Sequence, residues 1–236
     1  MHIPGRNPTI EALRSAYKVK TVYMEEGMNQ DEKIREILTL SKAKGTEIIE
    51  VPRKQLDKLA EGENHQGIVA EAKDISPKPF NAQTLIDHPG FYIYIREALY
   101  EHNIGAIIRT AEAAGIAGVI LTPKQDLTAT IGRMSMGAVF HIPIYSGSLF
   151  PTIKEFKQAG MIVSGIETNG AKNIFESDLK TDGMLIVGGE DRALSTEVAT
   201  KCDQLLFIPQ AGKINSLNMS VAAAIAIYEH IRQVKA

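Results

Sequence analysis

Short runs rich in Val, Ile and Leu alternate with amphipathic helical segments along the second half of the chain. Each run is short and almost continuously apolar, which is typical of a strand buried on both faces. Strands of this kind, each followed by a helix, pair in parallel and carry helices on both faces of the sheet. The sequence therefore predicts an α/β fold with a mostly parallel sheet. The candidate strands are FYIYI, AGVILT, HIPIY, MIVSGI, MLIVGG and QLLFIP.

A smaller α/β domain is predicted for residues 1–74, where charged helices alternate with short strands. Residues 75–88 are rich in proline and break both periodicities, so we expect a linker there with one helical turn near Gln83 to Ile86. The parallel-sheet domain then occupies residues 89–236.

Composition excludes several classes of protein. The single cysteine, Cys202, rules out an internal disulfide framework, and the six histidines are scattered without the spacing of metal ligands, so no metal site is predicted. No apolar run approaches the roughly 18 residues that cross a bilayer, and the first residues lack a signal-peptide core, so we expect a cytoplasmic protein that does not enter the membrane. A net charge of −2 means that any binding of nucleic acid would need a local basic patch.

The segment Ile208–Glu229 joins a Pro/Gly loop to a helix rich in small residues. Polar side chains collect at the start of this helix, where unpaired main-chain N–H groups can donate hydrogen bonds to a polar or anionic ligand. The simpler interpretation is a core helix with an Asn or Ser N-cap. The face expected to be buried consists of Leu217, Val221, Ala224, Ile225 and Tyr228.

Two further segments carry candidate chemistry. In Asn103–Gly115, Asn103 is a natural N-cap, and Arg109 lies off the apolar stripe, where it could equally be a solvated residue paired with Glu112. The run Leu185–Leu194 places two glycines and Glu190 directly after a strand, where the main chain can approach a ligand closely. Absence of GxGxxG after a strand, GxxxxGK[ST], GxSxG and HExxH argues against dinucleotide, P-loop, hydrolase and zincin chemistry.

The order and spacing of three segments, Asn103–Gly115, Val187–Glu190 and Ile208–Ala224, resemble motifs one, two and three of the SpoU family. That family consists of RNA ribose 2′-O-methyltransferases within the SPOUT superfamily. The N-terminal Gly5-Arg6-Asn7-Pro8 and His65-Gln66-Gly67 resemble the substrate-binding extension of the subgroup that methylates a guanosine of 23S ribosomal RNA.

The resemblance implies a SPOUT-type α/β knot, in which the last helix is threaded through a loop to form a deep trefoil knot. It also implies S-adenosylmethionine as cofactor, a homodimer formed through the C-terminal domain, and a role in rRNA processing. The residues that it implies for catalysis are Arg109, Glu190, Ser216, Asn218 and Asn103; those for cofactor binding are Gly188, Gly189, Ile208, Gly212 and Leu217; and those for RNA binding are Arg6, Asn7 and His65.

The implied function is S-adenosylmethionine-dependent 2′-O-methylation of a ribose in RNA, with a guanosine of 23S rRNA as target. Two alternatives stay open. One is a tRNA ribose 2′-O-methyltransferase, which shares all three motifs. The other is a non-catalytic rRNA-binding or ribosome-assembly protein of the same fold, because Asp191 and Ala193 replace two glycines that are common in motif two.

Overall fold

The computed structural model describes residues 1–236 apart from residues 97, 189–193, 215 and 236. Contacts divide the chain into two compact units. Unit 1 comprises Met1–Ser76 together with Asp126–His141, and unit 2 comprises Pro77–Gln125 together with Ile142–Ala236. The segment Asp126–His141, which the sequence predicts to be part of the second domain, therefore makes its contacts with the N-terminal residues.

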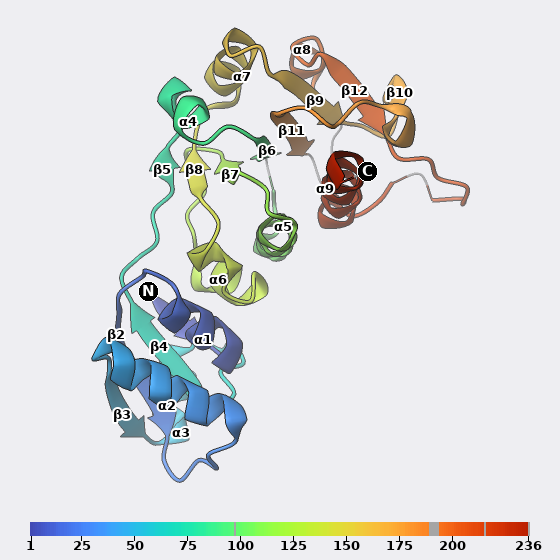
Figure 1. The fold of residues 1–236 in the computed structure, drawn as a ribbon. Helices are drawn as coiled ribbons and strands as arrows, with labels where there is room; N and C mark the ends of the chain where they lie inside the picture. The colour runs from blue at the N-terminus through green and yellow to red at the C-terminus, as the bar shows by residue number, and fades with distance from the viewer. Residues whose placement is uncertain (97, 189–193, 215, 236) are drawn as a thin grey trace. The chain divides into compact units, whose positions relative to one another are not determined.

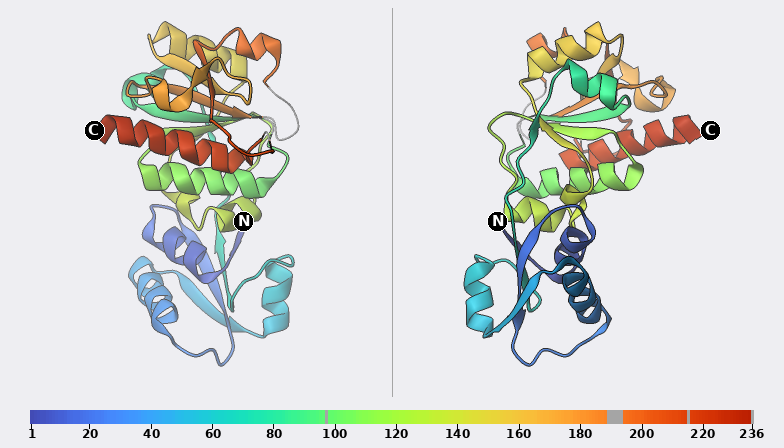
Figure 2. Two further views of the ribbon diagram at one scale, coloured as in Figure 1. Left: turned by 90° about the vertical axis from the view of Figure 1, so that its right-hand side faces the viewer. Right: turned by 60° about the vertical axis from the view of Figure 1, so that its left-hand side comes forward.

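Unit 1 is built on a four-stranded sheet in the order β1-β4-β2-β3. Strands β1 and β2 each pair antiparallel with β4, and β2 pairs parallel with β3. Helices α1 and α2 lie on one face of this sheet and α3 lies on the other (Figures 1 and 2). The elements are β1 (His2–Pro4), α1 (Arg6–Arg14), β2 (Val19–Glu25), α2 (Glu32–Lys44), β3 (Glu47–Val51), α3 (Arg53–Leu59), β4 (Ile68–Ala72), α6 (Ala129–Met134) and the 3-10 helix η1 (Ala138–Phe140).

Local sequence explains where the helices of unit 1 begin and end. The Asp31 side chain accepts a hydrogen bond from the Ile34 N–H and caps α2, and Gly45 ends the helix in the left-handed conformation. Gly137 has a φ of +89°, and a Cβ there would lie 2.5 Å from the Cβ of Glu11 on α1. Only glycine therefore allows the segment that contains η1 to pack this closely on α1.

Unit 2 contains a sheet whose eight described strands follow the order β10-β12-β9-β11-β6-β7-β8-β5, and every neighbouring pair is parallel. The predicted α/β class with a mostly parallel sheet is confirmed. The strands are β5 (Lys78–Pro79), β6 (Phe91–Arg96), β7 (Gly118–Leu121), β8 (Ile144–Ser146), β9 (Ile162–Ile166), β10 (Lys172–Asn173), β11 (Gly183–Gly188) and β12 (Gln204–Phe207).

Helices cover both faces of this sheet, as the buried strands require. Helices α5 and α9 lie side by side on one face, and α4, α7 and α8 lie on the other (Figures 1 and 2). The helices are α4 (Ala82–Asp87), α5 (Glu101–Ala114), α7 (Leu149–Gln158), the 3-10 helix η2 (Ile174–Glu176), α8 (Thr196–Ala199) and α9 (Met219–Lys235). The expected helical turn in the proline-rich segment is α4, which follows the short edge strand β5. Among the described residues, no helix combines the length and the apolar character needed to span a bilayer.

The predicted buried face of the last helix is wrong. Helix α9 begins at Met219, so Leu217 lies before it, and Val221 and Tyr228 are 46% and 52% exposed. The residues that are buried instead are Met219, Ala223, Ala226, Ile227, Glu229, His230 and Gln233. The helical period is thus correct, but the face that packs on the unit's own core is a different one.

Polar contacts at the C-terminal half of α9 explain this choice of face. The amide of Gln233 donates to the Ser177 carbonyl at 2.8 Å and accepts from the Leu179 N–H at 2.9 Å. The imidazole of His230 stacks on Phe91, with ring centroids 4.2 Å apart, and its Nδ1 donates to the Leu179 carbonyl at 2.5 Å. The loop at residues 177–179 therefore satisfies side chains that could not otherwise be buried.

A cluster of aromatic rings under α7 gives a direct test of the core. Phe156 is fully buried and stacks on Phe80, with centroids 5.5 Å apart, whereas Phe150 on the same helix is 41% exposed. Phe156→Ala should lower the free energy of unfolding by about 3–5 kcal/mol through lost burial and a residual cavity. Phe150→Ala should cost less than about 1 kcal/mol. Urea unfolding followed by circular dichroism would measure both, and equal losses would contradict this packing.

Candidate active site

The carboxyl ends of the parallel strands bring several predicted site residues to one edge of the unit 2 sheet. Strand β11 ends at Gly188, which pairs in register with Arg96 at the end of β6. Glu167 directly follows β9, and Ile208 directly follows β12. Because ligands of open α/β sheets bind outside the carboxyl ends of the strands, this edge is the candidate active site. The predicted cofactor residues Gly188 and Ile208 both lie on it.

Gly188 is needed for the close approach of β11 and β6 at this edge. A Cβ at this position would lie 2.9 Å from the Cβ of Arg96 and 3.2 Å from the Arg96 carbonyl oxygen. Real Cβ atoms do not approach other atoms that closely without displacement, so a side chain at position 188 would push the end of β6 away. Without a side chain at position 188, the main chain of motif two stays accessible to a ligand and β6 stays close to β11.

The loop between β12 and α9 is exposed and presents both polar and apolar groups. Ser216 is exposed, Leu217 is 39% exposed, and a Cβ added to Gly212 would meet nothing within 4 Å. The side chain of Asn218 accepts hydrogen bonds from the Ser220 N–H at 2.9 Å and the Ser220 hydroxyl at 2.6 Å. An Asn therefore caps the last helix, as the sequence predicts.

Helix α5 carries the predicted catalytic arginine on an exposed face. Arg109 has no ion pair with another described residue, so the alternative pairing with Glu112 is not found in this part of the chain. The prediction that Asn103 is an N-cap is wrong, because α5 begins at Glu101 and Tyr100 is its N-cap. The Asn103 N–H instead donates to the Tyr100 carbonyl at 3.0 Å, and its side chain is buried within the first turn. Gly189 and Glu190 lie outside the described residues.

Sequence reasoning missed a carboxylate at the candidate active site. Glu167 is half-buried, and it accepts a hydrogen bond from the Leu194 N–H, just beyond motif two. Burial raises the pKa of this carboxyl group, while the Leu194 N–H and the positive charge of Arg96 oppose the rise. A polar residue at the end of a buried strand or directly after it is the signal that would have identified both Arg96 and Glu167.

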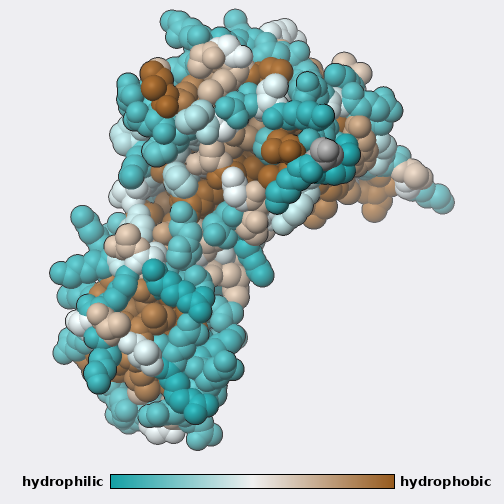
Figure 3. Space-filling view, viewed as in Figure 1, coloured by the Kyte–Doolittle hydropathy of each residue, from teal (hydrophilic) through white to brown (hydrophobic). Residues whose placement is uncertain are grey.

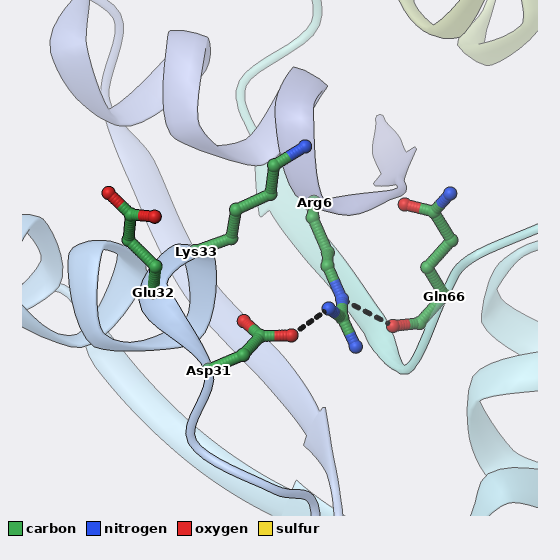
Figure 4. Close-up of a pocket in the computed structure, with 5 residues that line it drawn as sticks. All are labelled: Arg6, Asp31, Glu32, Lys33 and Gln66. Carbon is green, nitrogen blue, oxygen red and sulfur yellow. Dashed lines mark hydrogen bonds and ion pairs between the residues drawn. The ribbon is translucent and has the colours of Figure 1, made fainter.

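A second cluster of predicted residues lies in unit 1, around a hollow of about 540 Å³ (Figure 4). The Arg6 guanidinium lies between two acceptors: its Nε donates to the Gln66 carbonyl at 3.0 Å, and one terminal nitrogen donates to the Asp31 carboxylate at 2.5 Å. The Gln66 amide points away from that carbonyl, as Figure 4 shows. The residues that line the hollow are Arg6, Asp31, Glu32, Lys33 and Gln66.

Asn7 and His65, the other predicted RNA-binding residues, lie next to this hollow. The Asn7 side chain accepts a hydrogen bond from Lys33 at 2.7 Å. His65 is 3% exposed; its Nδ1 accepts from the Gly67 N–H, and its Nε2 lies 3.0 Å from the Asp57 carboxylate. Both ring nitrogens are thus used inside unit 1, and the geometry favours a role for His65 in holding the turn that follows it.

The Asp31 carboxylate links helix capping to the orientation of Arg6. Its pKa is lowered, first by the hydrogen bond from the Ile34 N–H and also by Arg6. A carboxyl group with a depressed pKa stabilises the fold above its unfolded pKa of about 3.9, and this stabilisation is lost as the pH falls through the folded value.

Asp31→Asn keeps a capping side chain but removes the charge. The variant should unfold at a lower temperature than the parent protein at pH 7. The difference should shrink as the pH falls below about 4 and disappear only below the lowered folded pKa of Asp31, where the parent carboxyl is neutral as well. Thermal unfolding between pH 2.5 and 7 would measure this. If the two unfolding temperatures still differed at pH 2.5, the loss of the Asp31 charge would not explain the effect of the substitution.

Comparison with known proteins agrees with this fold. Residues 90–228 match the SpoU rRNA methylase family, and residues 2–77 match the family of RNA 2′-O ribose methyltransferase substrate-binding domains. YacO of Bacillus subtilis, provisionally named a TrmH-family tRNA/rRNA methyltransferase, is 33% identical over 98% of this chain and 95% of its own length.

Solved structures resemble the whole chain. The S-adenosylmethionine-bound rRNA methyltransferase of Sinorhizobium meliloti is 28% identical, with a TM-score of 0.80 over 99% of this chain and 87% of its own. The SpoU methyltransferase AviRb of Streptomyces viridochromogenes shares the fold, with a TM-score of 0.81 at 24% identity, over 99% of this chain and 89% of its own. The fold and the order of the motifs define a methyltransferase of the α/β class. The chain belongs to the SpoU rRNA methylase family.

Proposed function

We propose that the protein transfers a methyl group from S-adenosylmethionine to a ribose 2′-hydroxyl of RNA. The observation that carries this proposal is the position of motifs two and three, which begin at the carboxyl edge of one parallel sheet, in a chain of the SpoU rRNA methylase family. Its relatives include proteins named tRNA/rRNA methyltransferases and a solved rRNA methyltransferase that holds the cofactor. The proposed target is a guanosine of 23S rRNA, and a tRNA ribose is the alternative.

The residues at this edge suit the proposed cofactor. A nucleoside needs apolar surface for its base and main-chain groups for its polar edges. Ile208 is half-buried and Leu217 is 39% exposed, so both can offer apolar contact, while Gly188 and Gly212 add no side chain that would obstruct the main chain. When bound, the cofactor supplies an electrophilic methyl group on a sulfonium. Gly189 completes the proposed cofactor-binding set, and Glu190 is proposed to help order the site for catalysis; both lie outside the described residues.

Arg109 is the proposed catalytic residue. A 2′-hydroxyl must lose its proton as it attacks, and a guanidinium group is too weak an acid to serve as the base at neutral pH. The exposed guanidinium of Arg109 is therefore suited to binding an RNA phosphate or stabilising the developing alkoxide. Ser216, Asn218 and Asn103 are proposed to order the site around it.

Arg109→Ala should reduce methyl transfer by about 10²-fold or more, because an electrostatic contact to the transition state is lost. Affinity for S-adenosylmethionine should stay unchanged. Incorporation of radiolabelled methyl into ribosomal RNA and calorimetry with the cofactor would measure the two effects. Glu112→Ala, an exposed change one turn along the same helix, is the matched control. Equal losses of cofactor affinity and turnover would contradict the separate roles.

The exposed face of α9 supports the proposed homodimer. Val221 and Tyr228 are separated by two helical turns on the outer side of the helix, with the half-buried Ala224 and Ile225 between them. Leu99 and Tyr100, which precede α5, are 62% and 63% exposed. Figure 3 shows apolar surface beside the C-terminal end of α9 on the face that it draws. Large exposed apolar side chains at helical spacing are typical of a surface that another protein covers.

Replacement of Tyr228 with arginine should therefore shift the protein from dimer to monomer, with little loss of monomer stability, since the side chain is 52% exposed. Sedimentation velocity over a concentration series would measure the shift. Ile86→Arg, at a site that is 72% exposed on α4, is the matched control and should leave the oligomeric state unchanged. A parent protein that sediments as a monomer at all concentrations would contradict the dimer.

Mapping of 2′-O-methyl groups in 23S rRNA and tRNA, with and without the gene, would identify the target. Loss of one guanosine methylation in 23S rRNA is the expected result. Loss of a tRNA methylation would support the alternative, and unchanged maps would contradict the enzymatic function.

A further inference from the structure

The hollow in unit 1 has a balanced charge, which restricts what it can bind. Arg6 and Lys33 contribute two positive charges, and Asp31 and Glu32 contribute two negative charges. The charge of Arg6 is further offset by its direct hydrogen bond to Asp31. A phosphate would gain little net attraction here, because two carboxylates lie beside the cations. A neutral ligand with both hydrogen-bond donors and acceptors fits this set better.

The guanidinium plane of Arg6 is held in place on two sides. One edge donates to the Gln66 carbonyl and another to the Asp31 carboxylate, while the side chain stays 24% exposed. A planar guanidinium that is fixed in this way offers a face on which an unpaired nucleobase can stack. The residues that line the hollow include no aromatic ring, so Arg6 is the planar group available there.

The Gln66 amide is positioned by a constrained turn. Gln66 has a φ of +50°, in the left-handed region that residues other than glycine seldom adopt. Its N–H donates to the Asn64 side chain at 3.3 Å, and the buried His65 accepts from the Gly67 N–H at 3.0 Å. The turn therefore directs the Gln66 carbonyl to Arg6 and leaves the amide exposed beside the hollow (Figure 4). An amide both donates and accepts, as the edge of a nucleobase requires.

We propose that this hollow binds an unpaired nucleobase of the RNA substrate, stacked on the Arg6 guanidinium and hydrogen-bonded by the Gln66 amide. The proposal rests on the proposed function, since it assumes an RNA substrate. It goes beyond that function in one respect: unit 1 binds a base that is not part of an RNA duplex, in addition to any contact with the phosphate backbone. A volume of about 540 Å³ is within the range of pockets that hold small ligands.

Two variants of the full-length protein separate base binding from phosphate binding. Gln66→Gly deletes the amide, and glycine adopts the left-handed turn more easily, so the carbonyl that holds Arg6 is preserved. Arg6→Lys keeps the positive charge but removes the planar group. Lys54→Ala, an exposed change on α3 outside the hollow, is the control for backbone contacts. Thermal unfolding would establish that each variant is folded.

The measurement is the affinity for a 12-nucleotide unstructured single-stranded RNA and for the matching 12-base-pair duplex, by fluorescence anisotropy over a series of salt concentrations. Gln66→Gly and Arg6→Lys should each weaken single-strand binding on the order of tenfold, with duplex binding and the salt dependence unchanged. Lys54→Ala should affect both RNA forms equally. If Gln66→Gly and Arg6→Lys weakened binding of single-stranded and duplex RNA equally, or had no effect on either RNA, the nucleobase pocket would be wrong but the proposed function would stand. Failure of the parent protein to bind either RNA would overturn the proposed function together with the pocket.

Discussion

Parallel pairing of the strands in unit 2 is the constraint on which the candidate active site depends. Because β6, β9, β11 and β12 all run in one direction, the residues at or directly after their carboxyl ends meet at a single edge. Arg96, Glu167, Gly188 and Ile208 come from four separate parts of the sequence and reach this edge without any local signal that links them. The same pairing requires helices on both faces, which accounts for the alternation of strands and helices along the chain.

Much of the fold could be predicted from local patterns, since buried strands and capped helices leave local signals. The parallel sheet, the end of α2 at Gly45 and the cap of α9 by Asn218 all follow from residues within a few positions of the feature itself. The short strand β1 was missed because three residues carry no usable periodicity. Its place in the sheet comes from antiparallel pairing with β4, which is more than sixty residues away along the chain.

The buried face of α9 could not be predicted either, because it depends on residues far away along the chain. In α9, Val221 and Tyr228 have larger side chains than Ala223 and Ala226, so the pattern favoured the outer face. The inner face is chosen by partners outside the helix, including the loop that satisfies Gln233. At the candidate active site, the motifs predicted Gly188 and Ile208 because loop chemistry is local. Glu167 has a local signal as well, since it follows a buried strand, but its place beside motif two depends on the pairing of β9 with β11.

The assignment of Asp126–His141 to unit 1 has a consequence for how this protein can be divided. The chain passes between the units three times, at residues 76–77, 125–126 and 141–142, so no single cut separates them. A fragment that starts at Pro77 would keep this segment but lose β1 and α1, on which it packs, and would leave Ile131, Val139 and Phe140 without the cover that now buries them. The segment Asp126–His141 belongs to unit 1 but connects β7 to β8 of unit 2. Unit 1 could therefore be removed, in evolution or by design, only if this connection were rebuilt as well.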